Sequence, residues 1–184
     1  MKKKAIVVLA NGFEEVEAAT PIDVLRRAGI DVIVAGLEDD TVTGAHGMMF
    51  KTDTVLEKIK TLPDAVIFPG GMPGAENLAR SSKVKDMILA MDSGKKLIAA
   101  ICASPALVLA PLGVLDGKKA TCYPGMDENF SAKVKCAKEK VVQDGNVITS
   151  RGPGTAFDFS LKIAENLAGK ETADMVGKQM LYSA

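Results

Sequence analysis

Short apolar runs alternate with segments of helical periodicity along the whole chain. Such runs, rich in Val, Ile, Leu and Ala, are typical of strands buried inside a parallel sheet. They occupy residues 5–10, 30–35, 65–68 and 97–101. Helix patterns fall at residues 14–27, 54–60, 82–91, 155–167 and 170–181, and one begins near residue 104. This alternation predicts an α/β fold with a mostly parallel sheet and helices on both faces.

Proline and turn residues add detail to this order of elements. Pro21 lacks an N–H and crowds the preceding turn, so it predicts a kink or a split of the first helix at Thr20. Further strands are predicted at residues 41–51, as a small β excursion, at 118–123, and at 140–143 and 147–150, which a turn at 144–146 joins as a hairpin.

Length and charge limit the possible functions. The 184 residues suit a single domain, 1–184, because single domains commonly reach about 200 residues. Lysine plus arginine and aspartate plus glutamate number 23 each, and no basic stretch follows residues 2–4, so no nucleic-acid or membrane-surface partner is predicted. No apolar run approaches the about 20 residues of a membrane span. The opening residues predict a first strand instead of a signal peptide.

The three cysteines, Cys102, Cys122 and Cys136, are odd in number and widely spaced. They form no C-x-x-C pair, so neither a metal site nor a disulfide framework is predicted, and a reduced, cytoplasmic setting is favoured. We treat Cys122 and Cys136 as structural or incidental.

Cys102 differs from the other two because it stands where a predicted strand meets a predicted helix. A side chain there points from the sheet edge toward a ligand, and the free N–H groups of the new helix favour a thiolate. Ser104 and Pro105 suit the helix start, one as a cap and the other because it needs no N–H. The alternative is a small buried apolar residue, and this segment alone does not choose between them.

Four loops that follow predicted strands contain the most unusual residues, and parallel strands bring such loops to one sheet edge. They cover residues 11–17, 70–74, 102–105 and 151–155. Gly70 and Gly71 expose backbone N–H groups and are candidates for one half of an anion pocket, with the Ala103 N–H as the other half. A plain turn is the alternative. Neither phosphate-binding glycine signature is present, which disfavours nucleotides and predicts no cofactor.

Three acidic residues, Glu14, Glu15 and Glu17, lie near the start of the first predicted helix, where the helix dipole stabilises negative charge. Glu17 is the candidate to point inward, because Ala18 and Ala19 beside it indicate close packing. If Glu17 meets Cys102, the two groups cannot easily both ionise, and the simplest arrangement is a neutral carboxyl donating to the thiolate. A solvated helix face is the alternative.

An ordinary cysteine hydrolase needs a histidine base at the thiol. The one histidine, His46, lies far upstream in the β excursion, Ala103 directly follows the cysteine, and Tyr123 is the next polar ring downstream. Peptidase and amidotransferase chemistry are therefore disfavoured.

Four segments together resemble the ThiJ/PfpI superfamily, most closely the branch that contains YajL and the human Parkinson-disease protein deglycase. They are Asn11-Gly-Phe-Glu-Glu-Val-Glu17, Phe68-Pro-Gly-Gly71, Ala99-Ala-Ile-Cys-Ala-Ser-Pro105 and Thr149-Ser-Arg-Gly-Pro-Gly-Thr155. The resemblance implies a flavodoxin-like three-layer sandwich, a homodimer, and Cys102 as an easily oxidised nucleophile with protonated Glu17 as its partner. It also implies an anion pocket formed by the Gly71 and Ala103 amides, with Arg151 nearby.

Three positions depart from that family or its branches. Related branches carry a histidine where Tyr123 or Ala103 stands, so efficient general-base catalysis is in doubt here. His46 stands where related chains often carry an arginine that reaches the partner's pocket. It is a hypothesis that His46 approaches Cys102 across a dimer interface; an exposed or interface-packing histidine is the alternative.

Three functions follow as hypotheses. The first is a cofactor-free glyoxalase or deglycase in which Cys102 attacks reactive dicarbonyls such as methylglyoxal, or their early protein adducts, without glutathione. The second is a redox-responsive protective protein or chaperone, in which Cys102 is oxidised to a sulfinic acid. The third is a flavodoxin-like binding module. The adjacent apolar residues Met48, Met49 and Phe50 are predicted to help form a dimer surface.

Overall fold

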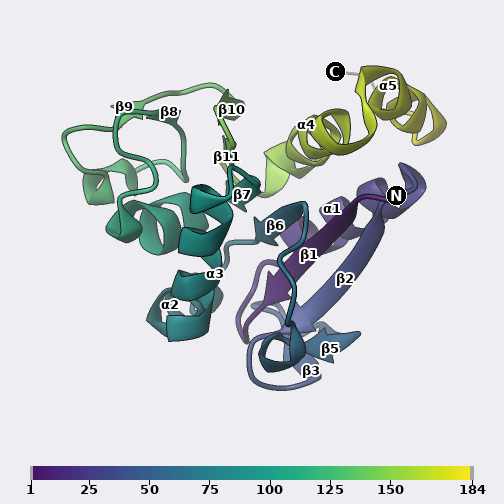
Figure 1. Ribbon diagram of the computed structural model, residues 1–184, viewed down its shortest axis with the longest axis horizontal. Coiled ribbons are helices and arrows are strands. Elements are labelled where there is room, and N and C mark those ends of the chain that lie inside the picture. Colours follow the sequence, from purple (N-terminus) through teal and green to yellow (C-terminus); the bar gives the residue numbers. More distant parts are fainter. Residues whose placement is uncertain (1, 183–184) are drawn as a thin grey trace.

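The structure, a computed structural model, describes residues 2–182 and is built around one seven-stranded sheet (Figure 1). The strands lie in the order β10-β11-β7-β6-β1-β2-β5, and β10 alone runs antiparallel to its neighbour in this sheet. Their bounds are β1 Lys4–Leu9, β2 Asp31–Gly36, β5 Thr54–Val55, β6 Ala65–Phe68, β7 Leu97–Ile101, β10 Val141–Asp144 and β11 Val147–Ser150.

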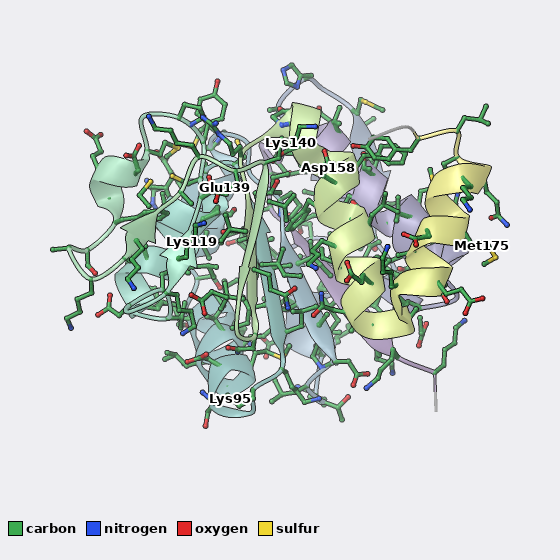
Figure 2. The ribbon with its side chains drawn as sticks, turned by 90° about the horizontal axis from the view of Figure 1, so that it is seen from above. Lys95, Lys119, Glu139, Lys140, Asp158 and Met175 are labelled. Carbon is green, nitrogen blue, oxygen red and sulfur yellow. The ribbon has the colours of Figure 1, made fainter. Side chains whose placement is uncertain are left out.

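Helices cover both faces of this sheet, because every second side chain of a strand points to the same face. Three helices pack on one face, where Val7 of β1 lies in their core: α1 Glu15–Arg27, α4 Ala156–Ala168 and α5 Lys170–Gln179. The other face, where Val8 is buried, is covered by α2 Gly74–Arg80, α3 Ser82–Ser93 and a π-helix, Pro105–Leu109. Figure 2 shows α4 and α5 side by side, with Lys140 near Asp158 at the start of α4.

Smaller elements extend the loops. Two-stranded sheets pair β3 Thr41–Thr43 with β4 Met49–Lys51 and β8 Lys119–Ala120 with β9 Lys135–Cys136. Single 3-10 turns lie at Leu56–Lys58, Ala110–Leu112, Asp127–Asn129 and Pro153–Thr155. Within residues 2–182, no helix has the length and apolar character needed to cross a membrane.

The predicted α/β class, a flavodoxin-like sandwich with a mostly parallel sheet, is confirmed. So are the β excursion and the 140–150 hairpin. The predicted split at Thr20 is wrong, because α1 continues through Pro21 to Arg27. Its apolar face, which includes buried Ala18 and Leu25, packs against the sheet and α4, and this packing outweighs one missing backbone hydrogen bond.

Other differences concern short elements. The helix predicted at 54–60 is a two-residue strand and a 3-10 turn, and the strand predicted at 118–123 has only two residues. Helix α2 was not predicted. Ser104 does not cap the helix that follows: its hydroxyl donates instead to the Pro69 carbonyl oxygen at 2.5 Å.

Candidate active site

Parallel strand ends bring the predicted loops together, as the main-chain hydrogen bonds between them show. The Glu14 N–H donates to the Gly70 carbonyl at 3.0 Å, and the Cys102 N–H donates to the Ser150 carbonyl at 3.0 Å. The carbonyl of Cys102 accepts from the Tyr123 N–H at 2.8 Å. Segments far apart in the sequence therefore surround one cysteine at the carboxyl edge of the sheet.

Cys102 occupies a strained turn directly after β7. Its φ is +65°, in the left-handed region that non-glycine residues rarely adopt, at a cost of about 1–2 kcal/mol. The side chain is buried, and 9% of the residue is exposed. A strand, a sharp turn and a helix in succession are the usual setting in which a nucleophile is presented above a sheet.

Glu17 lies in the first turn of α1 and is fully buried. Its Oε2 accepts a hydrogen bond from the Gly70 N–H at 2.8 Å, while its Oε1 has no hydrogen-bond partner among the described residues. Burial raises the pKa of Glu17 to about 7, although the Gly70 N–H and the Cys102 thiol oppose that rise. The carboxyl is buried, and Gly70 lies against both Glu17 Oε2 and the Cβ of Cys102, so the side chain faces the cysteine while its catalytic role stays a prediction.

The thiol and the carboxyl group depend on each other's proton. Burial raises the pKa of Cys102 to about 12, and the charge of Glu17 adds to the rise, whereas the Gly71 and Ala103 amides lower it. The net direction of this pKa opposes the thiolate that the helix amides are predicted to favour, and burial is the largest cause. A proton on Glu17 removes its opposing charge, while the Gly71 and Ala103 amides act against the cost of burial.

The two glycines have different roles. Gly70 packs so closely that an added Cβ would lie 2.6 Å from the Cys102 Cβ and 2.9 Å from Glu17 Oε2. Because its N–H is donated to Glu17, Gly70 is not a free donor for a ligand, which corrects its predicted place in the anion pocket. The Gly71 amide acts on the sulfur, and its φ of +87° suits glycine.

Tyr123 and Arg151, two of the predicted supporting residues, lie in different surroundings. Tyr123 is half-exposed, and its ring lies beside Gly152. Arg151 donates to the Lys138 carbonyl at 3.0 Å and forms no hydrogen bond or ion pair with Cys102 or Glu17 within residues 2–182. Its predicted place near the thiol therefore has no direct contact to support it.

His46 binds elsewhere in this chain. Its Nδ1 lies 2.8 Å from Glu15 Oε2, so its ring is engaged at the start of α1. The hypothesis that it approaches Cys102 from a second copy concerns a dimer and stays a prediction. Glu15 itself was missed as a buried residue, because an acidic side chain in a first helical turn is already explained by the helix dipole.

A flavodoxin-like sandwich with a buried cysteine on a strained turn, paired with a buried carboxyl group, defines a cysteine-centred α/β protein. Comparison with known families identifies the family to which this chain belongs. The model of the DJ-1/PfpI family matches residues 3–166, and the chain belongs to this family.

Individual relatives agree with that assignment. The Drosophila melanogaster protein dj-1beta is 47% identical over 186 residues, covering 100% of this chain and 99% of the relative. Its crystal structure superposes with a TM-score of 0.96 at 46% identity, covering all of both chains. The Toxoplasma gondii DJ-1 structure described as oxidized has a TM-score of 0.95 at 40% identity, covering 99% of this chain and 100% of that one. A Caenorhabditis elegans relative named glutathione-independent glyoxalase DJR-1.2 is 36% identical, covering 97% of this chain and 96% of the relative.

Proposed function

We propose that this protein is a cofactor-free thiol enzyme that converts small reactive dicarbonyls, such as methylglyoxal, or their early adducts on proteins. The observation that carries the proposal is the buried Glu17 carboxyl beside the Cys102 thiol, with the Gly71 and Ala103 amides acting on the same sulfur. The similarity to a relative named a glutathione-independent glyoxalase supports this choice of substrate class.

The reaction begins from the form of the pair that holds one proton. As Cys102 Sγ adds to the aldehyde carbon, Glu17 takes up the thiol proton, and the carbonyl electron pair moves to oxygen. The Gly71 and Ala103 amides stabilise that oxyanion, and Glu17 supplies a proton to give a hemithioacetal.

Product formation requires one further proton transfer and water. Glu17, now a carboxylate, removes the proton from the former aldehyde carbon and returns it to the adjacent carbon, while the hydroxyl proton of the adduct passes to the former ketone oxygen. These two transfers convert the adduct to a thioester of lactate. Water hydrolyses the thioester and restores the thiol. The net reaction adds one water to methylglyoxal to give lactate, and neither glutathione nor a metal is consumed.

A second function is a redox-responsive protective protein, in which peroxide oxidises Cys102 to a sulfinic acid held by the same amides. The structure of a relative described as oxidized favours keeping this candidate. Both functions use the same sulfur, and they differ in what happens to it.

The test combines turnover with mass spectrometry on the purified chain. We expect Cys102→Ser to lose at least about 100-fold in dicarbonyl turnover, because serine is a far weaker nucleophile at this pH. Cys136→Ser is the matched control, because Cys136 is exposed and lies in β9, outside the sheet that carries Cys102. Turnover that survives Cys102→Ser contradicts the enzyme proposal. Negligible wild-type turnover with selective gain of two oxygen atoms at Cys102 favours the redox function.

We also propose that two copies associate through the surface formed by Val16, Met48 and Met49. All three are large apolar residues with about half or more of their area exposed, and Met49 reaches 74%. The Met48 N–H donates to Glu15 at 3.4 Å, so the β3–β4 hairpin and the start of α1 form one continuous surface. The free thiols at all three cysteines support a reducing, cytoplasmic location.

A further inference from the structure

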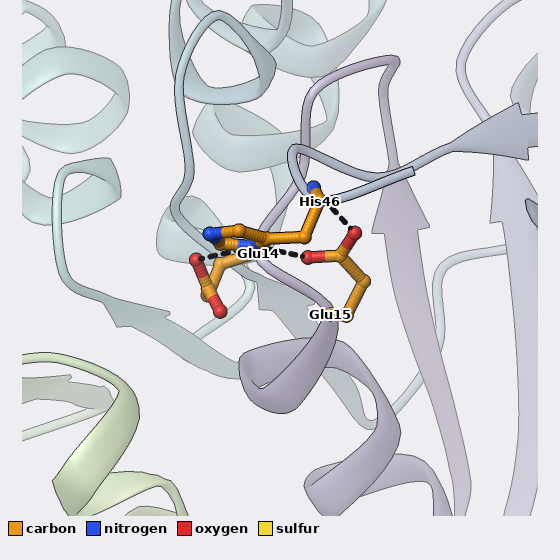
Figure 3. Close-up of side chains that lie close together, drawn as sticks. All are labelled: Glu14, Glu15 and His46. Carbon is orange, nitrogen blue, oxygen red and sulfur yellow. Dashed lines mark hydrogen bonds and ion pairs between the residues drawn. The ribbon is translucent and has the colours of Figure 1, made fainter. Parts of the chain in front are cut away.

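His46 lies between two carboxylates that the proposed reaction does not use (Figure 3). Its Nδ1 is 2.8 Å from Glu15 Oε2 and 3.7 Å from Glu14 Oε2. One ligand atom from each of the three residues lies within 4.8 Å of the other two. The residues come from separate elements, since Glu14 and Glu15 begin α1 and His46 belongs to the loop between β3 and β4.

Hydrogen bonds and the His46 ring hold the carboxylates of this cluster. Within residues 2–182, no lysine or arginine forms an ion pair with Glu14 or Glu15. Two carboxylates therefore face one imidazole, whose side chain is 70% exposed. Glu15 is buried, with 4% of the residue exposed, and hydrogen bonds from the hairpin offset its charge.

The loop that carries His46 is held in place by its backbone. The His46 and Met48 N–H groups both donate to Glu15 Oε1, at 2.7 and 3.4 Å, and the Ala45 N–H donates to the Phe13 carbonyl at 2.8 Å. Gly44 lies so close that an added Cβ would be 2.3 Å from Glu15 Oε1. The donor atoms are therefore assembled in advance, which lowers the cost of placing them around an ion.

We propose that Glu14, Glu15 and His46 form a binding site for a divalent cation of the zinc class. One imidazole nitrogen and two carboxylate oxygens are suitable ligands for Zn²⁺, and three protein ligands leave a fourth position for water. The ion replaces the proton on His46 Nδ1 and ties the β3–β4 hairpin to the start of α1.

The two contacts of His46 Nδ1 need little movement. Ligand atoms of a tetrahedral zinc site lie about 3.3 Å apart, so the 2.8 Å contact widens and the 3.7 Å contact shortens by about half an ångström. The exposed ring of His46 has room for that shift, while the buried Glu15 stays in place. The proposed reaction takes no proton or contact from Glu14, Glu15 or His46.

The test is isothermal titration of ZnCl2 into the full chain carrying Cys102→Ser, so that the candidate nucleophile does not bind zinc. We expect one Zn²⁺ per chain and a rise in melting temperature with zinc concentration. His46→Ala and Glu14→Gln should weaken binding more than about tenfold and abolish most of that rise. His46 is the one histidine of the sequence, so its variant reports on this site alone.

The exposed Glu38 provides the matched control, because it lies outside the cluster. Glu38→Gln should bind zinc as the parent does. Absence of zinc binding in the parent would overturn the proposal. So would unchanged affinity in His46→Ala, or an equal loss in Glu38→Gln and Glu14→Gln.

Discussion

Two single residues at the sheet edge determine the surroundings of the Cys102 sulfur. Glu17 binds a proton beside it, and Gly70 leaves the space that it occupies. Glu17 holds the proton because it is buried with one donor, the Gly70 N–H, and one oxygen without a hydrogen-bond partner. Gly70 makes room because any Cβ would meet Cys102. Removing either property changes the chemistry of the thiol without changing the thiol itself.

The raised pKa of Glu17 predicts how stability changes with pH. The ordinary value of 4.5 applies to the unfolded chain, and the folded value is about 7. Between these values the folded chain binds the proton more tightly than the unfolded chain does, so stability falls as pH rises through this window and is level above it. A shift of 2 to 3 pH units corresponds to about 3 kcal/mol.

Urea unfolding of wild type and Glu17→Gln at pH 4.5 and pH 8, with a chelator present, measures this effect. The free energy of unfolding of wild type should fall by about 3 kcal/mol more than that of the variant, which cannot lose this proton. Equal falls in the two proteins would show that Glu17 titrates normally in the folded chain.

The site residues that follow strands could be found from the sequence. Cys102, Ala103 and Gly71 stand directly after apolar runs, so their meeting at one edge follows from parallel pairing alone. Other contacts depend on side-chain and amide directions that no local sequence pattern encodes. Examples are the Gly70 N–H that donates to Glu17 and the Arg151 side chain that donates to the Lys138 carbonyl.

Helices and strands show where local preferences hold and where packing overrides them. α3 begins and ends at local signals: the Ser81 hydroxyl accepts from the Val84 N–H at 3.4 Å, and Gly94 follows the last turn. α1 continues through its internal Pro21 because its buried face packs against the sheet and α4. Short elements such as β5 and α2 carry too few residues for a periodic pattern to appear.

The cap of α3 gives a test at this scale. Ser81→Ala leaves the Val84 N–H without its side-chain acceptor, so we expect a loss of about 0.5–1 kcal/mol in the free energy of unfolding. Ser82→Ala, at the next and exposed position, should change it by only a few tenths. Chemical denaturation of the two variants in parallel gives the comparison, and equal losses would argue against the cap.

The whole molecule combines a sheet edge that gathers the site with a nearby apolar surface. Val16, Met48 and Met49 lie close to the β1–α1 connection that carries Glu17. Met175 of α5, a helix that packs on the same face of the sheet as α1, is also exposed (Figure 2). We therefore expect a second copy to cover Met49 and to leave Met175 exposed.

Sedimentation of charge-bearing variants tests that difference. Met49→Glu should convert the wild-type dimer to a single chain at micromolar concentration, because a buried unpaired carboxylate strongly opposes association. Met175→Glu should leave the dimer intact. A wild type that sediments as one chain, or dimers unaffected by Met49→Glu, would contradict the proposed surface.

The sequence by itself determined the α/β order, the place of Cys102 and the acidic helix start that holds Glu17, because apolar periodicity and strand ends are local properties. Only the tertiary structure decided which way each group faces: that Gly70 serves Glu17, that Ser104 binds Pro69, and that His46 meets Glu14 and Glu15. These contacts join residues more than thirty positions apart, and their geometry comes from how the sheet, the hairpin and α1 pack together.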